Sequence, residues 1–397
     1  MTTTTEIDWS AQDCLDRDLY QRDPHPFFTW MRANRPVYRD PHGIWVVAKH
    51  EDVRWCERQP TIFSSAAGSR PNGRPQPSLI DSDDPWHAAQ RRLVAQGFTH
   101  RQMQQYAHHV QAVTTRLVDA VIDQGHCDIV ADIAKPLPMT LIGEMLGAPE
   151  EDYARLQHWS DVMITGSDKP EYVTDEVVTA AFEYHEYISR IIEHRRTHPG
   201  DDLVSALVHG EADGQRLDHD HLVGNSLLLL VGGNETTRNV IAGGVHAMLG
   251  HHEEMAIARG SLDSGELSPA VVEECVRWVT PINHMNRTTT EDVEVRGVTI
   301  PAGSQVLMAY LSANRDEDVF DRPFAFDVTR HPNPHLAFGF GPHLCLGAQL
   351  ARLELTLVFS ELLSRLPHLR LADPDAPLRY GHSSFVRGLT TLPVVFD

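Results

Sequence analysis

Apolar and polar residues follow two patterns along the chain: long segments with helical spacing and a few short runs rich in β-branched residues. The segments in which apolar residues recur every three or four positions cover residues 101–124, 137–146, 151–165, 172–197, 219–250, 268–279 and 347–365. Short β-rich runs predict a hairpin over 36–47, strands over 293–300 and 306–308, and a last strand over 392–396. We therefore expect a mainly α fold with a minor sheet built from both ends of the chain.

A length of 397 residues permits two or three domains. The candidate functional residues below are spread over most of the sequence and belong to one centre, so we expect a single domain over residues 1–397. Its helical bulk is predicted at about 85–280 and 347–365, and its β-rich part at about 36–50, 290–310 and 380–397. A loop rich in Pro and Gly at 68–77 is expected to form a wall or gate of a site.

The charge balance excludes some classes of partner. The chain has 34 Lys and Arg against 55 Asp and Glu, a formal net charge of −21, so no nucleic-acid partner is expected. The longest apolar run, Leu227–Val231, is far shorter than the roughly 20 residues needed to span a bilayer. The N-terminus lacks the basic and apolar segments of a signal peptide. The 5 cysteines show no CxxC spacing. We expect a cytoplasmic protein with no membrane anchor.

One cysteine lies in a distinctive segment, Phe338-Gly-Phe-Gly-Pro-His-Leu-Cys-Leu-Gly347. Glycines at 339, 341 and 347 permit a positive φ and allow the backbone to lie against a flat ligand. A helical pattern begins directly after Cys345, and a helix N-terminus favours a thiolate. A lone cysteine is also compatible with a small buried apolar residue. Held as a thiolate, it can bind haem iron.

The spacing Phe-x-x-Gly-x-His-x-Cys-x-Gly decides between these alternatives, because it resembles the haem-binding loop of the cytochrome P450 family. The resemblance implies that Cys345 is the metal ligand, that the cofactor is haem b and that O₂ is a co-substrate. It also implies that Phe338, Gly339 and Gly347 lie against the cofactor. The expected fold is that of the family, with haem between a long distal helix and the proximal cysteine loop with its helix.

The apolar helix expected at 219–250 is interrupted by Gly232-Gly233-Asn234-Glu235-Thr236-Thr237. Two glycines cost a helix about 1 kcal/mol each relative to alanine, so a contact or a ligand should require them. The residues alone also allow a close helix crossing with a surface Glu. The resemblance implies that Gly232 and Gly233 leave room for dioxygen on the haem face. It further implies that Thr236 and Glu235 are the catalytic alcohol and acid that deliver protons.

Glu274 and Arg277 lie three residues apart and can pair on one helix face. Such a pair is usually solvated and worth tenths of a kcal/mol. The resemblance implies instead a buried pair that braces the cysteine side of the haem, with Arg330 as a possible third member. Ala325 stands where many relatives have Arg, which leaves the partner of the pair open.

Two carboxylates on a buried cofactor edge need cations or hydrogen-bond donors around them. His87 and Arg91 lie four residues apart on one predicted helix face, and Arg287 lies in a strand-like run. Each of these residues alone is compatible with a surface cation. Together with His343, two residues before the cysteine, they resemble the propionate-binding set of the family.

The substrate class rests on weaker features. The runs 77–81, 232–238 and 332–339 resemble the actinobacterial steroid side-chain hydroxylases of the family. Six residues besides Gly232 are expected by position to line the substrate pocket, together with parts of 66–80: Leu228, Val231, Ile282, Asn283, His284 and Phe385. Asn283 and His284 indicate a substrate with hydrogen-bonding groups.

Two substrate classes therefore stay open, a steroid or similar lipid and a polar or carrier-protein-tethered aminoacyl substrate. For the carrier, Arg70 and Arg74 could form part of a basic entrance. In either case the resemblance implies a monooxygenase that hydroxylates an unactivated C–H bond of a small molecule with O₂ and two external electrons.

Nothing in the chain resembles a flavin or iron–sulfur module, so we expect a ferredoxin and a ferredoxin reductase as electron donors. Arg92, Arg101 and Arg352 are candidate docking cations or ordinary surface residues. A haem sensor or storage protein is the alternative from another class. The segment Gly232–Thr237 speaks against it, since a sensor does not need proton delivery.

Overall fold

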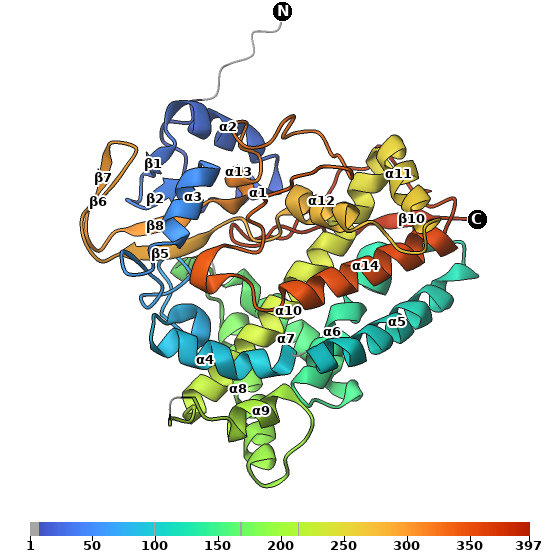
Figure 1. Ribbon diagram of the computed structural model, residues 1–397, viewed down its shortest axis with the longest axis horizontal. Helices are drawn as coiled ribbons and strands as arrows, with labels where there is room; N and C mark the ends of the chain where they lie inside the picture. Colours follow the sequence, from blue (N-terminus) through green and yellow to red (C-terminus); the bar gives the residue numbers. More distant parts are fainter. Residues whose placement is uncertain (1–7, 99, 167–168, 213) are drawn as a thin grey trace, which may run out of the picture.

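A computed structural model describes residues 8–98, 100–166, 169–212 and 214–397 of the chain. Helices make up most of it, and the strands lie at two opposite edges of the view, with the C-terminal strand apart from the larger sheet (Figure 1). The helices are α1 (Arg17–Gln21), α2 (His25–Asn34), α3 (His50–Glu57), α4 (Trp86–Val94), α5 (His100–Ile122), α6 (Pro136–Met145), α7 (Tyr153–Thr165), α8 (Asp175–Thr197), α9 (Leu203–His209), α10 (His219–Gly250), α11 (His252–Leu262), α12 (Pro269–Val279), α13 (Tyr310–Ala313) and α14 (Ala348–Arg365).

The long periodic segments are helical as predicted and correspond to α5, α6, α7, α8, α10, α12 and α14, with ends shifted by at most a few residues. Shorter helices such as α3 and α11 were not predicted. They are too short to show a sustained pattern, and helices of this length depend on packing against the rest of the protein.

The strands form a five-stranded sheet, a three-stranded sheet and a two-stranded hairpin in the described part of the chain. The largest sheet has the order β1 (Val37–Arg39), β2 (Trp45–Val47), β8 (Gln305–Met308), β5 (Met285–Thr289) and β3 (Phe63–Ser64). The second has the order β4 (His126–Asp128), β10 (Pro393–Val395) and β9 (Arg370–Leu371). The hairpin joins β6 (Val293–Val295) to β7 (Val298–Ile300).

The hairpin predicted at 36–47 is confirmed. Asp40 accepts hydrogen bonds from the N–H groups of His42 and Ile44, at 2.9 and 2.8 Å, and Gly43 has a φ of 88°. The prediction of one sheet built from both chain ends is wrong. The C-terminal strand β10 pairs with β4 from the middle of the chain and not with β1 or β2, because short strand patterns do not identify their partners.

Helix α10 runs through the centre of the molecule (Figure 1). Its 32 residues begin after Asp218, whose side chain accepts a hydrogen bond from the N–H of His221. The helix packs against α6, α12 and α14, and the largest apolar core cluster includes side chains of α10, α12 and α14. Because α14 follows the cysteine loop directly, this packing brings the loop close to α10.

Candidate active site

The cysteine loop has an irregular backbone that its glycines permit. Gly339 and Gly341 have φ values of 71° and 69°, which favour glycine. A Cβ on Gly341 would lie 2.3 Å from the carbonyl oxygen of Glu57, so no larger residue fits there. The N–H of Cys345 donates to the carbonyl of Phe338 at 2.8 Å. These constraints fix the loop just before α14.

Gly347 differs from the expectation, because its φ is −81° and a positive φ is not needed there. It is the N-cap of α14, and a Cβ at this position would meet no atom within 4 Å. Gly347 lines the same cavity as Cys345. Its small size therefore leaves open space beside the thiol.

The thiol of Cys345 faces a cavity of about 1510 Å³ that includes its opening to solvent. Burial raises the pKa of this thiol, while the N–H of Gly347 and the charges of Arg91 and Arg352 act in the opposite direction. The N–H at the start of α14 thus acts in favour of the thiolate, as expected, but burial of the thiol outweighs it. A metal ion bound to the sulfur would deprotonate it outright.

The two adjacent glycines of α10 have different environments. Gly232 lines the cavity, and a Cβ there would meet nothing within 4 Å. A Cβ on Gly233 would lie 2.3 Å from Cδ1 of Ile142 on α6. Gly232 thus leaves space in the cavity, whereas Gly233 allows two helices to pack closely.

Thr236 also lines the cavity, and its hydroxyl donates to the carbonyl of Gly232 at 2.8 Å. Glu235 points elsewhere: it is 2% exposed and pairs with Arg238, which also binds Asp161 at 2.6 Å. Burial raises the pKa of Glu235 to about 8, and a hydrogen bond to Asp161 acts in the same direction. Although burial opposes it, the bond from Glu235 and the charge of Arg238 lower the pKa of Asp161 to about 2. Glu235 therefore holds a proton at neutral pH.

Three of the four predicted propionate donors line the cavity, namely Arg91, Arg287 and His343. The guanidinium of Arg91 also donates to the carbonyl of Leu344 at 2.6 Å. Burial and the charge of Arg287 lower the pKa of His343 to about 2, so His343 is neutral.

His87 lies behind His343, with ring centroids 4.0 Å apart. It is 2% exposed, and its Nδ1 lies 3.1 Å from Oδ1 of Asp84. Its Nε2 has no hydrogen-bond partner among the described residues. A buried polar atom without a partner indicates a ligand group that it can bind.

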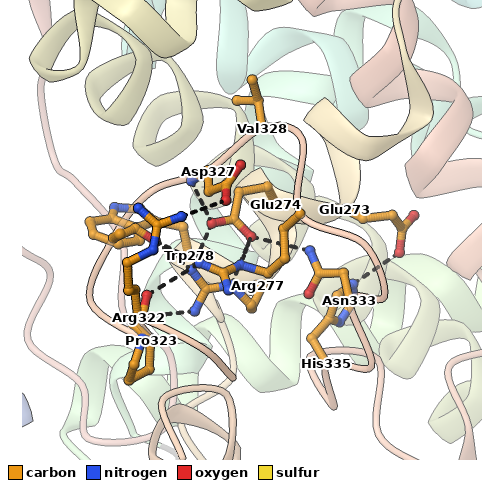
Figure 2. A network of polar contacts seen from close by, with 12 residues as sticks. Glu273, Glu274, Arg277, Trp278, Arg322, Pro323, Asp327, Val328, Asn333 and His335 are labelled. Carbon is orange, nitrogen blue, oxygen red and sulfur yellow. Dashed lines mark hydrogen bonds and ion pairs between the residues drawn. The ribbon is translucent and has the colours of Figure 1, made fainter. Parts of the chain in front are cut away.

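Glu274 and Arg277 form a fully buried ion pair with two contacts of 2.7 Å (Figure 2). The Nε of Arg330 lies 3.2 Å from Oε2 of Glu274, which makes Arg330 the third member. The residue at 325 participates through its backbone, because the carbonyl of Ala325 accepts from Arg277 and Arg330 at 3.1 and 3.0 Å. The side chain missing at this position is therefore not needed for the network.

Only some of the residues predicted for the substrate pocket line the cavity. Leu228 and Ile282 line the cavity together with Gly232. Four further predicted residues are not among the lining residues: Val231, Asn283, His284 and Phe385.

The segment 282–284 packs instead against the segment 383–386. Ile282 forms a bridge with Val386, and the amide of Asn283 donates to the carbonyl of Ser384 at 2.8 Å. His284 lies edge-on to Phe385 and is 2% exposed. Because Asn283 and His284 are buried behind the cavity wall, their polarity does not indicate a polar substrate.

Several cavity residues were not predicted from sequence. Apolar side chains supply most of them, and a single apolar residue carries no sequence signal for such a role. They are Val94, Phe98, Ile142, Leu229 and Met285, whereas the lining residues Leu79 and Ile80 fall within the range 66–80 that was expected to contribute. Glu354 of α14 is the exception, as a charged residue between Leu353 and Leu355 is detectable. It lines the cavity, is 3% exposed, and burial raises its pKa to about 8.

The candidate docking cations are engaged within the protein or lie outside the described side chains. Arg352 binds Glu273 at 2.6 Å. The side chain of Arg101 lies outside the described residues. Arg70, proposed for a basic entrance, lies over the ring of Phe385, with Cζ 3.5 Å from the centroid. Arg74 is exposed.

Comparison with known proteins identifies the family. The family model for cytochrome P450 matches residues 20–388. A steroid C26-monooxygenase of Mycobacterium tuberculosis is 42% identical over 387 residues, which cover 97% of this chain and 96% of that protein. The chain therefore belongs to the cytochrome P450 family, and it is a monooxygenase.

Solved structures agree with this assignment. A cytochrome P450 from Bacillus megaterium in complex with testosterone has a TM-score of 0.87 and 33% identity, and the match covers 96% of this chain and 99% of that one. P450BioI in complex with an acyl carrier protein bearing hexadec-9Z-enoic acid has a TM-score of 0.87 and 30% identity, with 96% and 100% covered. The predicted fold, mainly α with a minor β region and the family's arrangement, is confirmed.

Membership of the family implies a haem iron, O₂ and external redox partners. The residues present fit a haem: a thiol faces the cavity, Gly232 and Gly347 leave space in it, and His87, which lies behind the lining residue His343, has an unpartnered nitrogen. Within the described ranges, no helix is both long and apolar enough to cross a bilayer.

Proposed function

We propose that this monooxygenase hydroxylates a terminal C–H bond of a steroid or a similar lipid. The observation that supports this most directly is the apolar character of the cavity above Cys345. Most of its walls are hydrocarbon, and Asn225 already uses its amide in bonds to Gln90 and to the backbone of Leu79 and His221. An apolar substrate loses little on entering such a space, whereas an unpaired polar group would be costly. A related protein named for steroid C26 oxidation fits the same substrate class.

The cofactor of the proposal is haem b, with no bound flavin or iron–sulfur cluster. When bound, it supplies the activation of O₂ and the oxidation of the substrate carbon. Cys345 would bind the iron, with Phe338, Gly339 and Gly347 beside the ring. The two propionates would be held by Arg91, Arg287, His343 and His87.

Proton delivery is assigned to the polar residues of α10. The hydroxyl of Thr236 lies on the cavity wall, where it can donate to a reacting oxygen species. Glu235 keeps its proton at neutral pH and lies next to Thr236 in sequence. The partly exposed pair of Asp161 and Lys135, 3.2 Å apart, links this region to solvent, from which Glu235 can be reprotonated.

The redox partners, the domain organisation and the cellular compartment are proposed from the sequence. We propose a ferredoxin and its reductase as electron donors and a single domain over residues 1–397, as predicted above. The free thiols of all five cysteines, four of them buried, fit a reducing cytoplasm.

A carrier-tethered substrate is the second candidate, because one structural neighbour was solved with an acyl carrier protein bound. Two observations weaken it for this chain. Asn283 and His284 do not reach the cavity, and the guanidinium of Arg70 lies against Phe385. An acyl carrier with a lipid chain would still fit the apolar walls.

Optical titration of the haem distinguishes these candidates. Cholestenone and free fatty acids should each be titrated against the purified protein, in parallel with acyl and aminoacyl carrier proteins. A shift of the Soret band from low to high spin with free sterol or lipid supports the proposal. A shift with loaded carriers alone supports the second candidate. Cys345→Ser, as the control, should abolish the thiolate spectrum of the reduced, CO-treated protein. If that spectrum persists, the site assignment is wrong.

A further inference from the structure

A buried carboxylate lies directly behind the cavity edge that holds the propionate donors. Glu57 ends α3, and its side chain is 1% exposed. One of its oxygens, Oε1, accepts from Nη2 of Arg287 at 3.1 Å and from the hydroxyl of Tyr310 at 2.7 Å. Arg287 and Tyr310 both line the cavity, so Glu57 contacts two wall residues at once.

The backbone of Glu57 also contacts the cysteine loop. A Cβ on Gly341 would come within 2.3 Å of the Glu57 carbonyl oxygen, so the end of α3 lies against the loop that holds Cys345. The residue therefore joins β5, α13 and the cysteine loop. A change at Glu57 should therefore affect three parts of the cavity wall at once.

The charge of Glu57 needs an explanation. An isolated buried ion pair is weak evidence for a gain in stability, because desolvation of both ions offsets their attraction. A carboxylate is also unfavourable close to where two more carboxylates should bind. The negative charge of Glu57 raises the pKa of Arg287, although burial opposes this, so that arginine is charged and its charge is partly neutralised.

We propose that Glu57 is a positioning residue that holds Arg287 in place and lowers the reduction potential of the bound cofactor by its negative charge. Its carboxylate holds the guanidinium and the Tyr310 hydroxyl at the wall and reduces the net positive charge there. The oxidised cofactor carries one more positive charge than the reduced form, so a fixed negative charge nearby favours oxidation. The other N–H groups of Arg287 would be available to a propionate, since a guanidinium has five N–H groups and Glu57 and the carbonyl of Asn286 accept two.

The test is a spectroelectrochemical titration of the holoprotein without substrate. Glu57→Gln keeps the shape and an acceptor oxygen but removes the charge, and it should shift the midpoint potential to more positive values. Glu317→Gln is the matched control, as Glu317 also pairs with an arginine, Arg32, at 2.7 Å but does not line the cavity. Its midpoint potential should equal that of the wild type. An unchanged potential in Glu57→Gln, with a wild-type haem spectrum, would overturn the proposal.

A second comparison applies if Glu57→Gln alone fails to fold because Arg287 loses its counter-ion. Neither Arg287→Gln nor the double variant Glu57→Gln/Arg287→Gln leaves a buried arginine without its counter-ion, because both lack Arg287. The double variant should have the more positive potential of the two, and equal potentials would refute the role of Glu57. The inference rests on the proposed haem site, yet the two fail separately: a wild-type protein that binds no haem contradicts the site, whereas haem-bound variants with unaltered potentials contradict only the role of Glu57.

Discussion

The buried network around Glu274 gives the sharpest prediction of stability. Its two carboxylate oxygens accept five hydrogen bonds: from Nε and Nη2 of Arg277, from Arg330, from Asn333 and from the N–H of Asp327 (Figure 2). Replacement of Glu274 by Gln removes the one ionic partner that Arg277 has among the described residues and introduces an amide group that faces cations. Arg277 and Arg330 keep their bonds to backbone carbonyls, but both then stay buried without a negative charge beside them.

The expected cost follows from this burial. Removing one member of a buried ion pair destabilises a protein by about 3–5 kcal/mol, because the remaining charge is left unpaired. Glu274 and Arg277 are each 0% exposed, so solvent cannot replace the lost contacts. Since a typical domain is stable by only about 5–15 kcal/mol, this variant should be close to the limit of folding.

Guanidinium-induced unfolding, followed by far-UV circular dichroism, measures the effect. Glu193→Gln serves as the control, because Glu193 and Arg196 pair at 3.0 Å with side chains 61% and 42% exposed, and such a pair should contribute at most about 1 kcal/mol. If Glu274→Gln loses no more stability than this control, burial does not determine the strength of the network. The haem spectrum of any folded Glu274→Gln protein should also show loss of thiolate ligation, since the network anchors the segment before the cysteine loop.

Three further predictions concern the cavity. Thr236→Ala should fold normally, because the hydroxyl only donates to Gly232, but it should consume O₂ without matching product; an unchanged product-to-O₂ ratio would exclude its role. Wild-type coupling should fall as pH rises through about 8, where Glu235 loses its proton, and Glu235→Gln should lack this step. The carboxyl group of Glu354 has a pKa near 8 in the folded protein and about 4.5 in the unfolded chain. Its ionisation therefore does not destabilise the fold below pH 4.5, whereas at pH 7 it costs about 3 kcal/mol. Glu354→Gln should therefore be more stable than wild type at pH 8 but not at pH 4, as denaturant unfolding of the haem-free proteins would show.

Sequence alone predicted the residues whose chemistry depends on local spacing. Cys345 and its glycines lie in one short segment, and Glu274 and Arg277 are neighbours on one helical turn. Such contacts are determined within a few residues. The long helices were predicted for the same reason, because their apolar spacing extends over several turns.

Contacts between distant segments could not be predicted in this way. Asn283 was assigned to the substrate pocket by its position in the chain, yet its amide donates to the carbonyl of Ser384, about a hundred residues away. No sequence pattern distinguishes Glu57, which lies behind Arg287 in the folded protein. Both contacts form only when distant segments come together near β5 in the folded protein, so no local sequence pattern indicates them.

The paired glycines of α10 show how one sequence feature can meet two physical needs. Gly232 and Gly233 have the same helix-propensity cost, and both were expected to provide space at the cofactor. Both glycines line the cavity, but successive residues on a helix point about 100° apart and meet different surroundings. A Cβ on Gly232 would meet no atom within 4 Å, whereas a Cβ on Gly233 would lie 2.3 Å from Cδ1 of Ile142 on α6. The close approach of α6 at Gly233 holds α10 in place, and this fixed position keeps the space at Gly232 next to Thr236. Because Ile142 also lines the cavity, the width of the cavity at this end depends on a helix contact within its own wall.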